Sequence, residues 1–150
     1  MSITIKTPRE IELMREAGRI LAEVHNELGK IIEPGITTLE IDKMGEKLIR
    51  SYGCEPSFLN YQGYPASICV SINDEVIHGI PGSRKLLEGD LVSIDIVVDK
   101  DGYFADATRS FVVGKNEKSY LCRINWNDCA IWCQYIPKND NYILLKITIL

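Results

Sequence analysis

The stretch LVSIDIVVDKDGYFADATRSF, residues 91–111, constrains the fold most, because it reads as two alternating runs joined by a turn. Alternation of apolar and polar residues is typical of a strand with one face on a core, and DKDG between the runs indicates a tight turn. A two-residue loop with Lys100 and Asp101 at its tip places Asp95 directly opposite Asp106. We therefore predict a β-hairpin that carries one acid in each arm.

This register divides the hairpin into two faces. Ser93 and Asp95 share the polar face with Asp106, Thr108 and Ser110. The apolar residues point to the other face: Val92, Ile94, Ile96, Val98, Ala105, Ala107 and Phe111. A three-residue loop with Gly102 as a bulge would shift the register by one and mix polar with apolar residues on both faces, so we rank it lower.

Two opposed acids need something to offset their repulsion. Directly opposed residues have Cβ atoms about 4.5–5.5 Å apart, and like charges at that spacing destabilise a sheet. A shared proton, a basic side chain between the acids or a bridging cation would offset the repulsion. Arg109 has the core-facing parity and Lys100 lies at the turn, so a divalent cation fits best. The alternative is a solvated acid at a sheet edge.

Two amphipathic helices are predicted before the hairpin. TPRE at 7–10 is a helix start with a capping box, and apolar residues three or four apart extend the first helix over 8–31. A second helix restarts at Thr38 and ends near Gly53. Residues 57–81 are rich in Tyr, Val and Ile and suggest short strands joined by turns, followed by a loop to residue 90. The predicted class is α/β (α+β), with the helices followed by an antiparallel sheet.

Two histidines and several pocket-type side chains are further candidates. His78, in NDEVIHGIP, stands at a predicted strand end, where an imidazole can bond a substrate or move a proton; a surface or packing role is the alternative. His25 lies on the apolar face of the first helix and is expected in the core. Four other residues could line an apolar pocket or simply pack on the core: Phe58, Tyr61, Tyr64 and Cys69.

Composition excludes several partner classes. The net charge is −4, and the basic residues are scattered, so we expect no direct nucleic-acid binding. No run approaches the roughly 18 apolar residues of a membrane helix, and no secretory signal is predicted. Five cysteines without an export signal indicate reduced thiols, so we expect a cytoplasmic protein.

Three segments resemble type I methionine aminopeptidases: IKTPREIELMREAGRILAEV, YQGYPASICVSINDEVIHGIPG and LEGDLVSIDIVVDKDGYFADATRSFVVG. The resemblance covers about residues 3–114, and NDEVIHGIP together with YQGYP favours this family over prolidase or aminopeptidase P. It implies an incomplete pita-bread fold and removal of initiator methionine from nascent polypeptides by two divalent ions (Co, Mn, Fe or Zn). It further implies a monomer that acts on nascent peptide N-termini, with the ribosome as a candidate partner.

The resemblance also implies a role for each candidate residue. Asp95 would bind one metal ion in bidentate fashion, and Asp106 would bridge both ions, with Thr108 in support beside Asp106. His78 would contact the substrate peptide. The remaining candidates would receive the methionine side chain: Tyr61 and Tyr64, with Phe58 and Cys69 at neighbouring positions.

The sequence also departs from the family. The remaining ligands of the family are one histidine and two glutamates, yet no histidine follows His78 and no glutamate follows Glu117. We expect the chain to bind at most one ion, weakly, and to be inactive alone. The alternative is a non-catalytic binding module or a truncated pseudoenzyme. Residues 1–114 are thus expected to form the N-terminal half of an aminopeptidase domain. The divergent tail, 115–150, suggests a frameshift or a sequencing error near codons 115–118.

Overall fold

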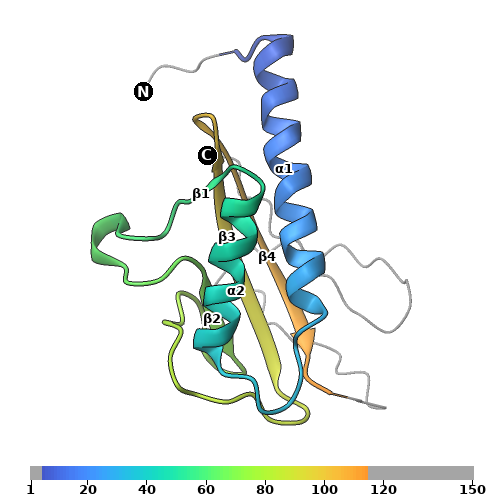
Figure 1. Ribbon diagram of the computed structural model, residues 1–150, viewed down its shortest axis with the longest axis vertical. Helices are drawn as coiled ribbons and strands as arrows, with labels where there is room; N and C mark the ends of the chain where they lie inside the picture. The colour runs from blue at the N-terminus through green and yellow to red at the C-terminus, as the bar shows by residue number, and fades with distance from the viewer. Residues whose placement is uncertain (1–4, 115–150) are drawn as a thin grey trace, which may run out of the picture.

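The computed structural model describes residues 5–114, and the predicted tail lies outside the described residues. Seven elements follow in chain order (Figure 1): α1 Pro8–Gly29, α2 Thr38–Ser51, β1 Glu55–Pro56, the 3₁₀ turn η1 Tyr61–Gly63, β2 Cys69–Ile72, β3 Leu91–Lys100 and β4 Tyr103–Val112. The predicted class, with two helices followed by an antiparallel sheet, is confirmed. Within residues 5–114, neither helix combines the length and the apolar content that crossing a bilayer requires.

Both helices begin with the same capping device. The Thr7 hydroxyl accepts the backbone N–H of Glu10, and the Glu10 carboxylate accepts the backbone N–H of Thr7. Thr37 and Glu40 repeat this arrangement at the start of α2. Such reciprocal bonds satisfy N–H groups that have no partner within the helix, which explains why the helices begin where they do.

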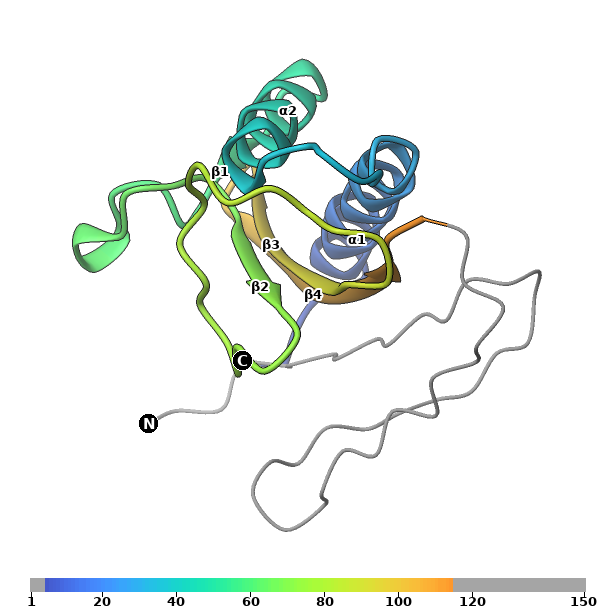
Figure 2. The ribbon, with the colours of Figure 1, turned by 90° about the horizontal axis from the view of Figure 1, so that it is seen from below.

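The sheet is organised around β3, the strand that carries Asp95. β4 pairs with β3 along its whole length, while β1 and β2 pair with different parts of β3, all antiparallel. Both helices lie on the same side of the sheet (Figure 2). The core between them contains four apolar side chains of β3 that alternate along the strand and are fully buried: Val92, Ile94, Ile96 and Val98. Ala105, Ala107 and Phe111 of β4 pack against it, as their parity predicted.

The predicted pairing of Asp95 with Asp106 is wrong. Lys100 pairs with Tyr103, so Asp101 and Gly102 form the turn, and Asp95 lies opposite Thr108. Asp101 and Gly102 both have positive φ, 53° and 83°, as a two-residue hairpin turn of the favoured type requires. The register therefore differs by two residues from the predicted one. A shift by two preserves the side on which each side chain lies, so the predicted faces remain correct.

The stretch 57–81 contains less strand than predicted. Within it, β2 is the single element in strand conformation that the described residues show. Asn60, Gln62 and Asn73 have φ of 65°, 48° and 56°. Positive φ is incompatible with an extended strand, so the chain forms loops before and after β2 instead. The predicted loop over 81–90 is confirmed.

Candidate functional site

The polar face of the sheet is built from rows of side chains across three strands. Cys69 of β2 lies opposite Asp95 of β3, and Asp95 lies opposite Thr108 of β4. The Thr108 hydroxyl donates a hydrogen bond of 2.7 Å to Asp95 Oδ1. In a neighbouring row the hydroxyls of Ser93 and Ser110 are 2.8 Å apart. Asp95 thus lies in a hydrogen-bonded polar layer on the side of the sheet away from the helices.

Asp106 lies on the same face, diagonal to Asp95. Its cross-strand partner is Val97, and this pair is the next one on the same face towards the turn. Diagonal neighbours are about 7–8 Å apart, compared with about 4.5–5.5 Å for opposed residues, so the two carboxylates repel each other less than the predicted register implied. Thr108 lies two positions along β4 from Asp106, on the same face, and its hydroxyl donates to Asp95, which occupies the directly opposed position.

Basic side chains near the hairpin are engaged elsewhere. Arg109 Nη1 donates to Asn26 Oδ1 of α1 at 2.7 Å, on the helix side of the sheet. Lys100 Nζ lies 2.7 Å from Asp101 Oδ2 at the turn. Arg109 and Lys100 thus bond to groups other than Asp95.

The donor set fits part of a metal site. Two carboxylates on one face are ligands that hard divalent cations prefer, and a hydroxyl that donates to one of them would orient it. Among residues 5–114, however, no group of three or more His, Cys, Asp or Glu side chains comes together in a way that could hold an ion. The described residues therefore offer two candidate ligands, Asp95 and Asp106, and no complete site.

Cys69 adds a neutral thiol to this face. Its side chain is almost fully buried, and the pKa of the thiol is raised to about 11. Burial is the main cause, the Tyr64 hydroxyl acts to lower the pKa, and the carboxylates of Asp95 and Asp106 contribute to raising it. The thiol is therefore protonated at neutral pH and presents an apolar, polarisable surface.

Tyr64 links the aromatic loop to β2. Its hydroxyl donates to the Gly79 carbonyl at 3.0 Å and lies 3.3 Å from the Ile68 carbonyl. Burial raises the pKa of Tyr64 well above its usual range. Its ring meets the ring of Phe58 edge to face, with centroids 6.0 Å apart. The structure thus brings Phe58, Tyr64 and Cys69 together, whereas Tyr61 on η1 is 62% exposed.

His78 lies in the loop that returns along the free edge of β2. Its side chain is exposed, and its φ of 57° lies in the left-handed region. The next residue, Gly79, accepts the Val70 N–H at 2.9 Å and donates to Ser71 Oγ at 3.1 Å. A Cβ at Gly79 would collide with the Val70 carbonyl, so only glycine permits this close approach. The predicted strand end at His78 is instead a loop docked on β2.

A buried acid that sequence reasoning missed sets the start of β2. Asp42 of α2 accepts the backbone N–H groups of Ser67 and Ile68 at 2.9 and 3.0 Å. Burial raises the pKa of the Asp42 carboxyl, and these two bonds act against that effect. The sequence signal for this role was the position of Asp42 directly after Ile41, on the buried face of α2. A buried acid needs hydrogen-bond partners.

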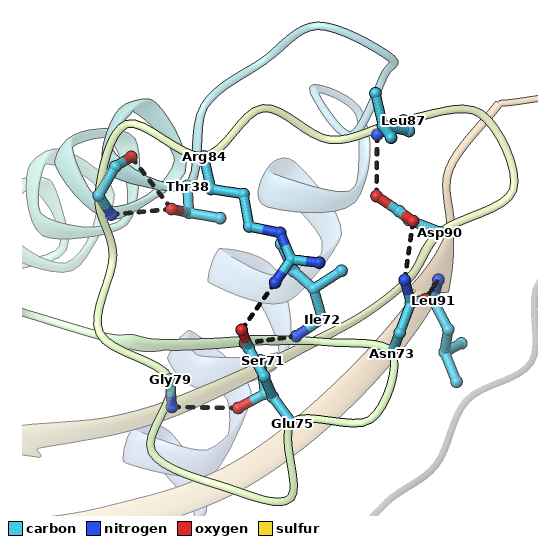
Figure 3. Close-up of polar contacts among 11 residues, drawn as sticks. Thr38, Ser71, Ile72, Asn73, Glu75, Gly79, Arg84, Leu87, Asp90 and Leu91 are labelled. Carbon is cyan, nitrogen blue, oxygen red and sulfur yellow. Dashed lines mark hydrogen bonds and ion pairs between the residues drawn. The ribbon is translucent and has the colours of Figure 1, made fainter.

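A second missed group closes the turn after β2 (Figure 3). Glu75 Oε2 accepts the Ile72 N–H at 2.8 Å, and Glu75 Oε1 lies 2.7 Å from Arg84 Nη1. On the other side of this turn, Asn73 Nδ2 donates to Asp90 Oδ1 at 2.9 Å. The sequence offers no signal for these pairs, because they join segments of a loop without periodicity.

Comparison with known proteins gives concordant matches. The model of metallopeptidase family M24 matches residues 12–129, which runs past residue 114. Methionine aminopeptidase 1 of Bacillus subtilis is 53% identical over 112 residues, which cover 75% of this chain and 45% of that relative. The chain therefore spans about half the length of this curated relative.

Solved structures agree with the sequence matches. The crystal structure of methionine aminopeptidase from Rickettsia prowazekii superposes with a TM-score of 0.75 at 38% identity, covering 76% of this chain and 46% of that chain. Aminopeptidase P of Escherichia coli superposes with a TM-score of 0.62 at 26% identity, covering 73% and 24%. The expected incomplete pita-bread fold and the resemblance to methionine aminopeptidases are confirmed. The chain belongs to metallopeptidase family M24.

Proposed function

We propose that residues 1–114 are the N-terminal half of a methionine aminopeptidase domain, which in its intact form removes initiator methionine from nascent polypeptides. The observation that carries this proposal is the pair Asp95 and Asp106 on one polar sheet face, with Thr108 bonded to Asp95. The 53% identity to a methionine aminopeptidase supports it. Residues 115–150 would be a divergent tail, and reading the coding DNA in its other two frames tests this division.

Asp95 and Asp106 would each supply a carboxylate to the metal centre. Asp95 and Asp106 would help to hold the metal ions, while Thr108 would restrain the Asp95 carboxylate through its hydrogen bond. Bound divalent ions supply an activated water at neutral pH and polarise the scissile carbonyl; Co, Mn, Fe and Zn are the candidates. Two carboxylates alone would hold at most one ion, weakly.

The loop before β2 would receive the methionine side chain. The rings of Phe58 and Tyr64 and the neutral thiol of Cys69 form an apolar group next to Asp95, and a thioether side chain packs well against such surfaces. Tyr61, which is exposed, would cover the bound side chain from the solvent side. His78, docked beside β2, would hydrogen-bond the peptide.

The proposed setting is the cytoplasm, where the monomeric enzyme would meet nascent peptide N-termini, with the ribosome as a candidate partner. The free thiols of Cys54 and Cys69 support a reducing compartment. Direct binding to nucleic acid or membrane is not part of the proposal, since the net charge of −4 favours neither.

Hydrolysis of a Met-Gly peptide by the purified chain tests the proposed inactivity. With added Co²⁺ or Mn²⁺, we expect no turnover, while a full-length methionine aminopeptidase assayed alongside cleaves the peptide. Turnover comparable to that enzyme would refute the expectation that this chain is inactive alone.

Metal binding is tested separately by paramagnetic broadening. In ¹⁵N spectra of the chain, Mn²⁺ should broaden the amide signals around Asp95 and Asp106 first, and this effect should disappear in Asp95→Asn. Uniform or absent broadening would contradict the proposed metal face. It would favour the alternative of a non-catalytic binding module.

A further inference from the structure

We propose that Arg84, acting through Glu75, is a positioning residue for His78. The inference rests on the proposed function in one respect only, namely that His78 is the side chain that meets the substrate. Within residues 5–114, the hydrogen bonds of Arg84 run to Glu75 and to the Thr38 N–H, not to a candidate metal ligand or pocket residue. Its effect would pass through the loop between Glu75 and Gly79 (Figure 3), which contains His78.

The Glu75 carboxylate closes the turn that follows β2. One oxygen accepts the Ile72 N–H at 2.8 Å, and the Glu75 N–H lies 3.2 Å from the Ile72 carbonyl. The other oxygen is 2.7 Å from Arg84 Nη1. The guanidinium therefore restrains the carboxylate that defines where the loop leaves the strand.

Arg84 is anchored on a rigid base. Its carbonyl accepts the Thr38 N–H at 3.0 Å, and the Thr38 hydroxyl exchanges two hydrogen bonds with the backbone of Gly82, at 2.8 and 3.1 Å. Thr38 is buried in the first turn of α2. The ion pair thus connects the His78 loop to a helix that packs on the core.

The other end of the loop is fixed at Gly79, which hydrogen-bonds to Val70 and Ser71 of β2. Between the two anchors, Val76 is 86% exposed and Ile77 is 57% exposed. A segment with so little buried surface depends on its ends for its position, because no packing of its own restrains it. Loss of the Glu75 anchor should therefore free residues 76–78.

The ion pair should have little effect on global stability. Its side chains are about half exposed, and exposed ion pairs contribute little to the free energy of unfolding because water screens them. If Arg84 positions His78, its loss should lower the backbone order of residues 76–78 and leave the order of the sheet unchanged. A purely structural role of Arg84 would instead lower the order of the sheet as well.

Backbone order parameters of the metal-free ¹⁵N-labelled chain provide the test. In the parent chain, the amides of residues 76–78 should have order parameters of about 0.85. In Arg84→Ala these order parameters should fall below about 0.6. Arg84→Lys, which keeps a cation, should restore at least half of the loss. Arg15→Ala is the matched control, because it breaks the exposed ion pair of Arg15 with Glu12 on α1. It should change none of these values.

The variant Glu75→Gln and the His78 ring signal provide a second test of the same ion pair. Glu75→Gln keeps an acceptor for the Ile72 N–H but removes the ionic partner of Arg84, so it should give the same loss of order. The His78 ring signal, identified by its absence in His78→Gln, should shift in both variants.

Two outcomes would overturn the proposal. Unchanged order at 76–78 in both Arg84→Ala and Glu75→Gln would show that the ion pair does not position the loop. Loss of order throughout β3 and β4 would show a structural role. Because no metal is present, the result is independent of the Mn²⁺ experiment, whose failure would contradict the proposed metal face and leave the positioning of the loop unaffected.

Discussion

Acidification should destabilise the fold through His25. This side chain is 3% exposed, and its Nε2 lies 3.1 Å from the Ala107 carbonyl of β4. Burial lowers the pKa of His25 from 6.5 to about 4; the bond to Ala107 acts against the shift, and the charge of Arg109 adds to it. Between these two pH values the unfolded chain binds more protons than the folded one. Stability present above pH 6.5 is therefore lost as the pH falls towards 4.

The size of the effect follows from the two pKa values. A shift from 6.5 to about 4 corresponds to about 3 kcal/mol over the whole window, of which about 2 kcal/mol should be lost between pH 7 and pH 5. Urea unfolding followed by far-ultraviolet circular dichroism at the two pH values measures this loss. His25→Gln keeps an N–H donor for Ala107 but does not titrate, so its loss should be smaller by about 2 kcal/mol.

Other titrating groups cancel in this comparison. The pKa of Asp42 is raised by burial, which changes stability in the opposite direction, but both chains share it. If His25→Gln loses as much stability as the parent between pH 7 and pH 5, burial does not keep this imidazole neutral and the reasoning is refuted.

Three further substitutions test the site and the core. Thr108→Val removes the hydroxyl that donates to Asp95, so the broadening per added Mn²⁺ should fall about 10–100-fold. Thr108→Ser keeps a hydroxyl and should retain the broadening. Equal broadening in the parent chain and both variants would contradict the role of Thr108 in orienting Asp95. Gly79→Ala would drive a Cβ into the Val70 carbonyl, and hydrogen exchange of the Val70 amide should accelerate; an unchanged rate would mean that the loop is not docked on β2. Ile96→Ala should lower the free energy of unfolding by about 2–5 kcal/mol in urea, because Ile96 is fully buried; a loss below about 1 kcal/mol would show that this face is not packed.

The register of the hairpin could have been predicted from turn chemistry. Asp-Gly is a favoured pair for two-residue turns, because both positions need positive φ and glycine adopts it without strain. Placing Lys100 and Asp101 at the tip ignored this preference and displaced the pairing by two residues. The error did not affect the two faces, since a shift by an even number of residues leaves each side chain on its side.

Contacts between distant segments could not be predicted from the sequence. His25 and Ala107 are 82 positions apart, and Tyr64 and Gly79 are 15 apart. Whether such groups meet depends on how the helices and loops pack, and no pattern of neighbouring residues in the sequence predicts that packing. The expected roles of His78 and the aromatic residues therefore came from the family resemblance rather than from spacing.

Local sequence determined the two helices, the hairpin and the side of the sheet on which each acid lies, because capping, periodicity and strand alternation act over a few residues. The hairpin register is also local, since the positive φ values of Asp101 and Gly102 place Asp95 opposite Thr108 rather than Asp106. The tertiary structure decided that His25 meets the Ala107 carbonyl, 82 positions away, because that contact depends on how α1 packs on β4. It also decided how the His78 loop is held, because the bonds at Glu75 and Gly79 exist only once α2, β2 and the loop have packed together.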